Sequence, residues 1–519
     1  MWWNPRNLRS HLGLQPQFAR IFCPNLYFLP KICYNITNNH KGATEMKKRP
    51  NILWLCADQQ RYDTIRALGN EYIDTPNLDR LCREGVAFDK AYVQNPVCTP
   101  SRSSFLTGKY PSAINANILG GDNLPEHCTL ITKALADAGY HCGNIGKLHI
   151  TTAWRGYEER GEDGYSTFIY SLSGGHQMES GVNAYRDWLI SKGIDFRDIM
   201  TNDSGKSDYF WYRPDAPIEL RQTAWMAEEA EKFIRERAAS DEPWLLSVNC
   251  FDPHPPYDAP THLIEKYLAR NIPDPIFNES DYTLGEQLKD AYHQSKGVNA
   301  PDDVMRRNKA SYYGTCEIVD SHYGRIIDLI DELGLRDDTV IIFSSDHGEM
   351  LGDHGLTHKG CRFYDGAVRV PLIFSCPARF ASGKVVKGIT EYTDIAPTIA
   401  ELCGIEFPDV HGHSLCAALS EEGGEGLERD YVRTEYYWSC LGPGKPPAYA
   451  TMFRDRRYKL VVYHGIETGE LYDMKEDPRE EHNLWYDPAY TEIRFNMLKK
   501  SFDVAAVLQR PGQTRIGRY

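Results

Sequence analysis

The chain has 519 residues, 41% of them hydrophobic and 12% aromatic, which is enough apolar material for a large core and excludes a wholly disordered protein. Its formal net charge of −14 argues against a general nucleic-acid-binding protein, which would carry a basic surface. No stretch approaches the roughly 18 consecutive apolar residues of a membrane helix, so we expect no membrane partner.

The N-terminal stretch lacks the pattern of a signal peptide, because prolines and polar residues interrupt its apolar positions. We expect residues 1–45 to form an extension outside the fold, residues 46–420 a catalytic domain, and residues 421–519 a C-terminal α+β subdomain. The 14 cysteines are spread along the chain without a Cys-x-x-Cys pair. That pattern favours buried, reduced thiols and a cytoplasmic location, with a periplasmic or secreted location as the alternative.

Four short apolar runs, each followed by polar residues, predict strands that are buried on both faces of a parallel sheet. They occupy residues 51–60, 141–149, 244–254 and 339–349. Amphipathic helices are predicted at residues 75–85, 129–140, 218–238 and 313–335. In the first helix we expect Thr75 as N-cap, Pro76 as the first helical residue and Gly85 as the C-terminal stop. Alternating strands and helices predict an α/β, doubly wound architecture.

The pattern changes near residue 420, in a stretch rich in Gly and Glu. Short aromatic segments with alternating polarity follow at residues 431–438, 448–465 and 470–474. They predict an antiparallel sheet, with a helix after it near residues 490–508.

Each of the four predicted strands ends in residues that can bind a metal ion or an anion. In chain order these are Asp58 and Gln59, Lys147 and His149, Asp252 and His254, and Asp346 and His347. Because ligands of open α/β sheets bind at the carboxyl ends of the strands, we expect these side chains to converge. Oxygen and imidazole ligands beside cationic groups suit a metal ion next to an anionic substrate.

A cysteine stands at the start of another predicted helix, in the stretch "NPVCTPSRSSFLTG" at residues 95–108. Pro100 suits the first turn of a helix that ends at Gly108. Cys98 is then expected just before the helix N-terminus, where backbone N–H groups and the helix dipole favour negative charge. Arg102, one turn further on, can reach back towards Cys98.

This stretch resembles the signature of the sulfatase family of the alkaline-phosphatase-like superfamily, Cys-x-Pro-Ser-Arg followed by Thr-Gly. Here the signature stands as Cys98-Thr99-Pro100-Ser101-Arg102 and Thr107-Gly108. The resemblance extends to residues 146–149, 251–257, 344–355, 369–374 and 470–484. It implies a large mixed, mostly parallel sheet flanked by helices, a smaller C-terminal antiparallel-sheet subdomain, and a sulfuric ester hydrolase.

The resemblance also implies how the chain would be activated and which metal it would hold. A formylglycine-generating maturation enzyme would oxidise Cys98, reading the motif around Pro100 and Arg102. One divalent cation would be held by Asp58, Gln59, Cys98, Asp346 and His347. We expect Ca²⁺, with Mn²⁺ or Mg²⁺ as alternatives.

The same resemblance assigns roles in the hydrolysis of a sulfated small molecule or saccharide, either a carbohydrate or an aryl sulfate. The hydrated formylglycine at position 98, activated by the metal and Arg102, would attack the sulfate sulfur. His149 would take a proton when sulfate is expelled. Lys147, His254 and Lys359 would neutralise the sulfate oxygens, and His254 or Lys359 would protonate the leaving alcohol.

Two residues depart from the pattern of many sulfatases, which have Asp where this chain has Gln59 and Asn where it has His347. Gln and His both occur in the related phosphonate monoester hydrolases, so hydrolysis of a phosphonate monoester or phosphodiester is the alternative function. They make the site less negative, which could shift the metal preference towards Mn²⁺. Ser101 and the pair Lys147 and His149 favour a sulfatase.

Two further alternatives remain. A sulfatase-like binding protein would keep Cys98 as a thiol. A two-zinc enzyme with an unmodified nucleophile would need more ligands, for which Asp353, His354 and His358 are the nearby candidates; loop residues lining the pocket are the simpler interpretation.

Overall fold

The computed structural model describes residues 49–122, 124–125, 128–153, 157–175, 181–202, 210–288, 296–297, 303–421, 429–440 and 446–508. The predicted N-terminal extension, residues 1–45, lies outside the described residues. Among the helices that are described, none is both long and apolar enough to span a bilayer.

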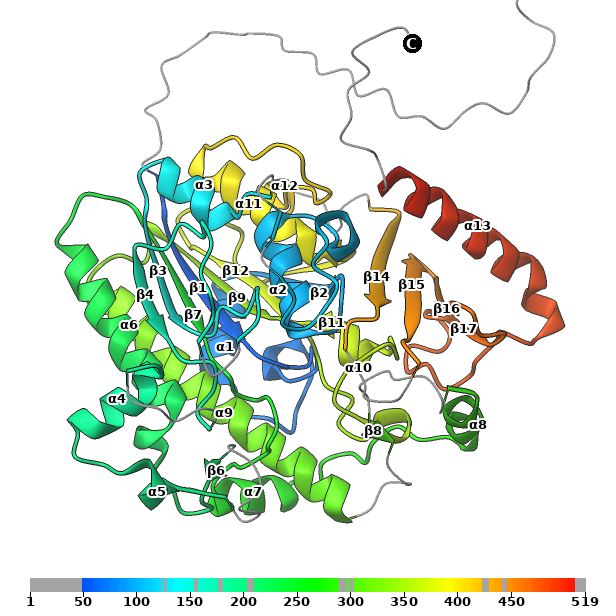
Figure 1. Ribbon diagram of the computed structural model, residues 1–519, viewed down its shortest axis with the longest axis horizontal. Helices are drawn as coiled ribbons and strands as arrows, with labels where there is room; N and C mark the ends of the chain where they lie inside the picture. Colours follow the sequence, from blue (N-terminus) through cyan, green and yellow to red (C-terminus); the bar gives the residue numbers. More distant parts are fainter. Residues whose placement is uncertain are drawn as a thin grey trace, which may run out of the picture. The chain divides into compact units, whose positions relative to one another are not determined.

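The central sheet contains the four strands that the sequence predicts, placed side by side. Among the described residues it has nine strands, in the order β11-β2-β12-β9-β1-β7-β3-β4, with β13 pairing with β2 (Figure 1). Their bounds are β1 (Asn51–Ala57), β2 (Gly85–Tyr92), β3 (His141–Gly146), β4 (Thr167–Tyr170), β7 (Trp244–Asn249), β9 (Thr339–Ser345), β11 (Arg369–Val370), β12 (Leu372–Ser375) and β13 (Lys384–Glu391). The predicted strands are β9, β1, β7 and β3, all parallel. Because β11 and β12 run antiparallel to their neighbours, the sheet is mixed but mostly parallel, as expected.

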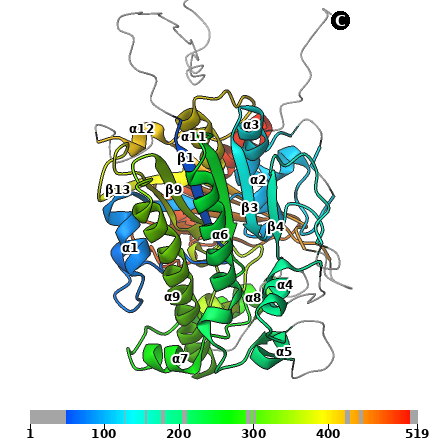
Figure 2. The same cartoon turned by 90° about the vertical axis from the view of Figure 1, so that its left-hand side faces the viewer.

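The unbroken apolar run of β1 follows from its position between two helical layers. Ile52 and Trp54 pack into the core on one face, and Leu53 and Leu55 pack into the core on the other. The helices of the first face include α2 (Cys98–Thr107), α3 (Ile131–Asp137) and α11 (Ile395–Cys403), and those of the second include α1 (Pro76–Arg83), α6 (Gln222–Ala238) and α9 (Asp303–Glu332). Figure 2 shows α6 and α9 side by side over the second face. Since successive side chains of a strand point to opposite faces, both sets must be apolar.

Several predicted helix ends are wrong; helix α6, for example, begins at Gln222 rather than at residue 218. Gly85 does not stop α1, which ends at Arg83; it begins β2 instead. A Cβ at Gly85 would lie 2.3 Å from the carbonyl oxygen of Phe374, so the glycine permits close pairing with β12. Helix α9 begins at Asp303 rather than at residue 313, because its polar first turns carry no apolar pattern that would reveal them.

The C-terminal sheet and helix lie where the sequence predicts them. Strands β14 (Tyr431–Tyr437), β15 (Tyr449–Asp455), β16 (Tyr458–Tyr463) and β17 (Gly469–Asp473) form an antiparallel sheet. Helix α13 (Thr491–Leu508) packs on this sheet (Figure 1). Its Met497 belongs to a small hydrophobic core that also contains Phe453 and Leu460 of the sheet. The domain boundary near residue 420 stays a prediction.

The described part of the chain also contains further α-helices and strands. They are α4 (Ala184–Ser191), α5 (Phe196–Ile199), β5 (Met200–Thr201), β6 (Trp211–Tyr212), α7 (Thr261–Leu268), α8 (Glu279–Leu288), β8 (Lys296–Gly297), β10 (Leu356–Thr357), α10 (Asp365–Val368) and α12 (Cys416–Leu419).

A buried lysine joins the C-terminal sheet to the rest of the protein. Lys459 of β16 is fully buried, and its Nζ lies 2.9 Å from an oxygen of Asp365 in α10 and 2.6 Å from an oxygen of Glu480. Burial raises the pKa of Glu480 and Lys459 opposes that rise, so the carboxyl depends on this cation for its charge. Removing one member of such a group leaves buried charge without a partner.

We therefore expect Lys459→Met to lower the free energy of unfolding by about 3–5 kcal/mol. Urea unfolding followed by tryptophan fluorescence measures the change. The matched control is Lys500→Met, because Lys500 is exposed and pairs with Asp455 at 3.1 Å. The control should change the free energy of unfolding by less than about 1 kcal/mol, and equal effects of both variants would contradict the prediction.

Candidate active site

The carboxyl ends of the parallel strands bring the expected side chains together. Asp58 and Gln59 follow β1, Asp346 and His347 follow β9, and Lys147 follows β3. All five residues are buried. The predicted convergence of these strand ends is confirmed.

Helix α2 brings Cys98 to the same edge of the sheet. The helix begins at Cys98 itself, with Val97 as N-cap, and ends before Gly108, whose φ of 67° is left-handed. The Sγ atom of Cys98 lies 3.1 Å from His347 Nε2 and 3.9 Å from Asp58 Oδ1. The thiol therefore faces the strand ends from the N-terminus of a fully buried helix, where backbone N–H groups favour negative charge.

Ser101 and Arg102 connect the first turn of α2 to the end of β9 by hydrogen bonds. The Ser101 hydroxyl donates to the Asp346 carbonyl oxygen, and Arg102 Nε donates to Asp346 Oδ2 at 2.8 Å. Arg102 Nη1 also donates to the Lys147 carbonyl oxygen at 3.0 Å. Arg102 Nη2 lies 4.0 Å from Asp58 Oδ2 and has no hydrogen-bond partner in the part of the chain that the structure describes. Among the described residues, this buried guanidinium thus keeps an unused donor on the side of Asp58.

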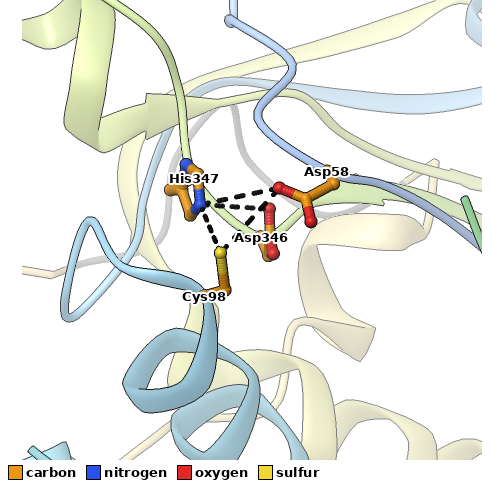
Figure 3. Close-up of side chains that lie close together, drawn as sticks. All are labelled: Asp58, Cys98, Asp346 and His347. Carbon is orange, nitrogen blue, oxygen red and sulfur yellow. Dashed lines mark hydrogen bonds and ion pairs between the residues drawn. The ribbon is translucent and has the colours of Figure 1, made fainter. Parts of the chain in front are cut away.

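Four side chains could hold a metal ion. Ligand atoms of Asp58, Cys98, Asp346 and His347 all lie within 4.8 Å of one another, and Figure 3 shows them pointing at a common centre. His347 Nδ1 lies 3.0 Å from the Gly348 carbonyl oxygen, to which it can donate, so Nε2 keeps its lone pair for the centre. Two carboxylates and an imidazole fit a divalent cation.

Cations offset the buried negative charge of this cluster. The Lys147 ammonium forms a salt bridge with Asp58. Burial opposes ionisation of Asp58, but Lys147, His347 and Arg102 hold its pKa well below the usual range. Burial and Asp58 oppose the thiolate of Cys98, yet Lys147, Lys359 and His347 still lower the pKa of that thiol. The site favours an anion at position 98.

Lys359, His254 and Gln59 form a second polar group beside the first. Lys359 Nζ lies 2.6 Å from Gln59 Oε1 and 2.9 Å from His254 Nε2. Since lysine only donates, His254 Nε2 is the acceptor, and its Nδ1 faces the Pro255 carbonyl oxygen at 2.8 Å. Burial and then Lys359 hold the pKa of His254 well below its usual value, so this histidine is neutral.

His149 sits in a turn that a buried glutamate stabilises. Its backbone is left-handed, with φ of 57°. The Glu158 carboxylate accepts N–H bonds from His149 at 2.5 Å, Ile150 at 2.6 Å and Thr151 at 3.0 Å. Burial, Lys147 and Arg102 hold the pKa of His149 well below its usual value, and its Nδ1 has no hydrogen-bond partner among the described residues. The ring is therefore a neutral base.

Glu158 could not be predicted from the sequence as a residue of the site. Its partners are backbone N–H groups, which leave no trace in a motif. The spacing of an acidic residue after a strand-end "GKLH" was the only signal in the sequence, and it is weak.

The candidate ligands of a second metal ion have other partners. Asp353 pairs with Arg61 at 2.8 Å, and the His354 ring stacks on Tyr364 at 3.7 Å. Within the described residues, the cluster around Cys98 is the one group of His, Cys, Asp and Glu side chains close enough to hold a metal. The described residues therefore offer no second site built from Asp353, His354 and His358.

Two known protein families match the sequence of this chain. The family described as Sulfatase matches residues 50–405, and the family described as N-sulphoglucosamine sulphohydrolase, C-terminal, matches residues 352–506. The chain belongs to the sulfatase family. It is a sulfuric ester hydrolase of the alkaline-phosphatase-like superfamily.

Its relatives include sulfatases and a phosphonate hydrolase. An arylsulfatase of Clostridium perfringens is 30% identical over 477 residues, covering 87% of this chain and 93% of the relative. An N-acetylglucosamine-6-O-sulfatase of Bacteroides thetaiotaomicron is 28% identical, covering 92% and 90%. The crystal structure of a phosphonate monoester hydrolase of Agrobacterium radiobacter superposes with a TM-score of 0.74 at 27% identity, covering 89% of this chain and 96% of that one.

The turn at His149 gives a direct test. We expect Glu158→Ala to lower kcat by about 10- to 100-fold, because three buried N–H groups lose their acceptor and His149 moves. Steady-state kinetics with a sulfate ester measures the effect. The neighbouring Glu159→Ala, at an exposed position, is the control and should leave kcat unchanged. Wild-type kcat in Glu158→Ala would contradict this role.

Proposed function

We propose that this sulfatase hydrolyses the sulfate ester of a carbohydrate or aryl alcohol, with a nucleophile made from Cys98 and one divalent cation. The observation that carries the proposal is the position of Cys98. Its thiol lies at a helix N-terminus among Asp58, Asp346 and His347, in a site whose cations favour an anion. The carbohydrate and aryl classes are supported by the two sulfatase relatives, which act on an aryl and an N-acetylglucosamine-6-O-sulfate ester by name.

The donor set fits a divalent cation held by Asp58, Gln59, Asp346, His347 and the modified Cys98. We propose Ca²⁺, because carboxylate and amide oxygens dominate, with Mn²⁺ or Mg²⁺ as alternatives. When bound, the cation would acidify the nucleophile and neutralise charge. A formylglycine at position 98, made by a maturation enzyme, would supply a hydrated aldehyde whose second hydroxyl allows sulfate to leave without an attacking water.

The chain's own side chains would bind the sulfate group and move the protons. Lys147 and Lys359 supply positive charge to the sulfate oxygens, and the spare Nη2 donor of Arg102 can orient the nucleophile. Neutral His149 can accept a proton. Since Lys359 donates to His254 and the pKa of His254 is low, Lys359 is the better proton donor for the leaving alcohol.

Phosphonate monoester or phosphodiester hydrolysis is a second candidate. Two observations favour it: His347 belongs to the cluster that could hold a metal ion, with the Gln59 backbone N–H donating to Asp346 of the same cluster, and a phosphonate monoester hydrolase is among the structural relatives. Two residues support the sulfate ester instead: Lys147, whose ammonium pairs with Asp58, and His149, because the resemblance assigns this pair to sulfatases.

Matched esters of one alcohol would separate the two candidates. We expect kcat/KM for 4-nitrophenyl sulfate to exceed that for 4-nitrophenyl phenylphosphonate by about tenfold or more, because the monoanionic sulfate offers more oxygens to Lys147 and Lys359. Release of 4-nitrophenol is measured with both esters on the same preparation. A preference for the phosphonate would make phosphonate hydrolysis the primary activity.

Replacing the proposed nucleophile tests the mechanism. We expect Cys98→Ala to abolish turnover and leave the unfolding midpoint near that of the wild type, since alanine fits the space of a small buried thiol. The matched control is Cys128→Ala, which changes a half-buried cysteine outside the cluster and should keep full activity. Turnover by Cys98→Ala would rule out a nucleophile at this position.

The maturation enzyme and the cytoplasmic location remain predictions of the sequence. A binding protein with an intact Cys98 thiol is disfavoured by the family match.

A further inference from the structure

Glu349 is a buried carboxylate that the proposed function does not use. It lies two residues after His347, and it is fully buried. Its Oε1 accepts N–H bonds from the backbone of Leu351, at 2.9 Å, and of His358. Its Oε2 accepts from the side-chain amide of Gln59. One carboxylate thus connects the end of β1, the loop after β9 and the turn that carries Lys359.

The three residues that donate these hydrogen bonds to Glu349 all have a left-handed backbone. The φ angles are 68° at Gln59, 51° at Leu351 and 66° at His358. Residues with a side chain adopt this conformation at a cost of roughly 1–2 kcal/mol each, so the surrounding structure must hold them. A buried acceptor for the N–H groups of Leu351 and His358 supplies part of that constraint.

The same carboxylate fixes which way the Gln59 amide points. A carboxylate only accepts hydrogen bonds, so the NH₂ group of Gln59 must face Glu349. The amide oxygen then faces Lys359, whose Nζ lies 2.6 Å away. Lysine only donates, so both contacts require this one orientation.

We propose that Glu349 is a positioning residue of the reaction. It holds the turn at His358 with one oxygen and orients the Gln59 amide with the other, and through both contacts it places the Lys359 ammonium beside the site. The inference rests on the proposed role of Lys359 in binding sulfate. It also explains a glutamine at position 59, since a carboxylate there would face the carboxylate of Glu349.

An exchange of the two isosteric side chains tests the proposal. In Glu349→Gln the carbonyl oxygen must stay with the two backbone N–H groups, so an NH₂ group faces the NH₂ of Gln59. In Gln59→Glu two carboxylates face each other. In the double variant, Gln59→Glu with Glu349→Gln, a carboxylate faces an NH₂ group and still accepts from Lys359. The pair is complementary again, but now the side chain at position 349 donates and the side chain at position 59 accepts.

We expect each single variant to lower kcat by about 10- to 100-fold, because a buried polar pair is mismatched and Lys359 is displaced. The double variant should exceed both single variants by about tenfold. Kinetics on the ester that the wild type hydrolyses best measures kcat and KM for all four proteins. A role in folding alone would lower the amount of folded enzyme without this recovery of kcat.

Thermal unfolding of the four metal-free proteins, in the presence of a chelator, gives a readout independent of activity. We expect both single variants to unfold at lower temperature and the double variant to recover. Recovery of the midpoint without recovery of kcat would overturn the positioning role, and recovery of neither would overturn the geometry. If no ester is hydrolysed, the proposed function fails, and the unfolding midpoints still decide the orientation of Gln59.

Discussion

The ion pair between Arg102 and Asp346 is the interaction on which the site depends. It joins the first turn of α2 to the end of β9, with Arg102 Nε at 2.8 Å from Asp346 Oδ2 and both side chains buried. Burial of two charges is costly unless each is paired and hydrogen-bonded. The pair therefore fixes where the helix begins relative to the sheet, and with it the position of Cys98.

Charge balance explains the rest of the cluster. Asp58 and Asp346 place buried negative charge at the carboxyl ends of the strands, and Lys147 and Arg102 form ion pairs with them. A divalent cation would complete this balance. Burial, together with the nearby Lys147 and Lys359, holds the pKa values of His149 and His254 well below the usual range, so both rings are neutral. Neutral imidazoles at these places can accept protons or hydrogen bonds, while the ammonium of Lys359 can give one up.

Much of the fold and of the site could be predicted from the sequence. The unbroken apolar run of β1 indicates burial on both faces of the sheet. The polar residues after each run indicate the edge of the sheet where ligands bind, and Asp58, Asp346 and Lys147 do lie at that edge. The short motif around Cys98 gives the helix. These signals are local, because each depends on a strand or helix and the residues next to it.

The parts that could not be predicted depend on contacts between distant segments. Gly85 resembles a helix stop in the sequence, but the backbone of β12 requires it. Glu158 and Glu349 act through backbone N–H groups, whose left-handed turns at His149 and His358 no side-chain pattern reveals. The orientation of Gln59 follows only once Glu349 and Lys359 are seen on either side of it.

The central claim is that the nucleophile is made from Cys98, and the mass of the tryptic peptide Ala91–Arg102 tests it most directly. The protein should be produced together with a formylglycine-generating enzyme. We expect a peptide in which the CH₂SH group of Cys98 has become an aldehyde, in a fraction of molecules that rises in proportion to the specific activity. An unmodified cysteine in every molecule of an active preparation would contradict it.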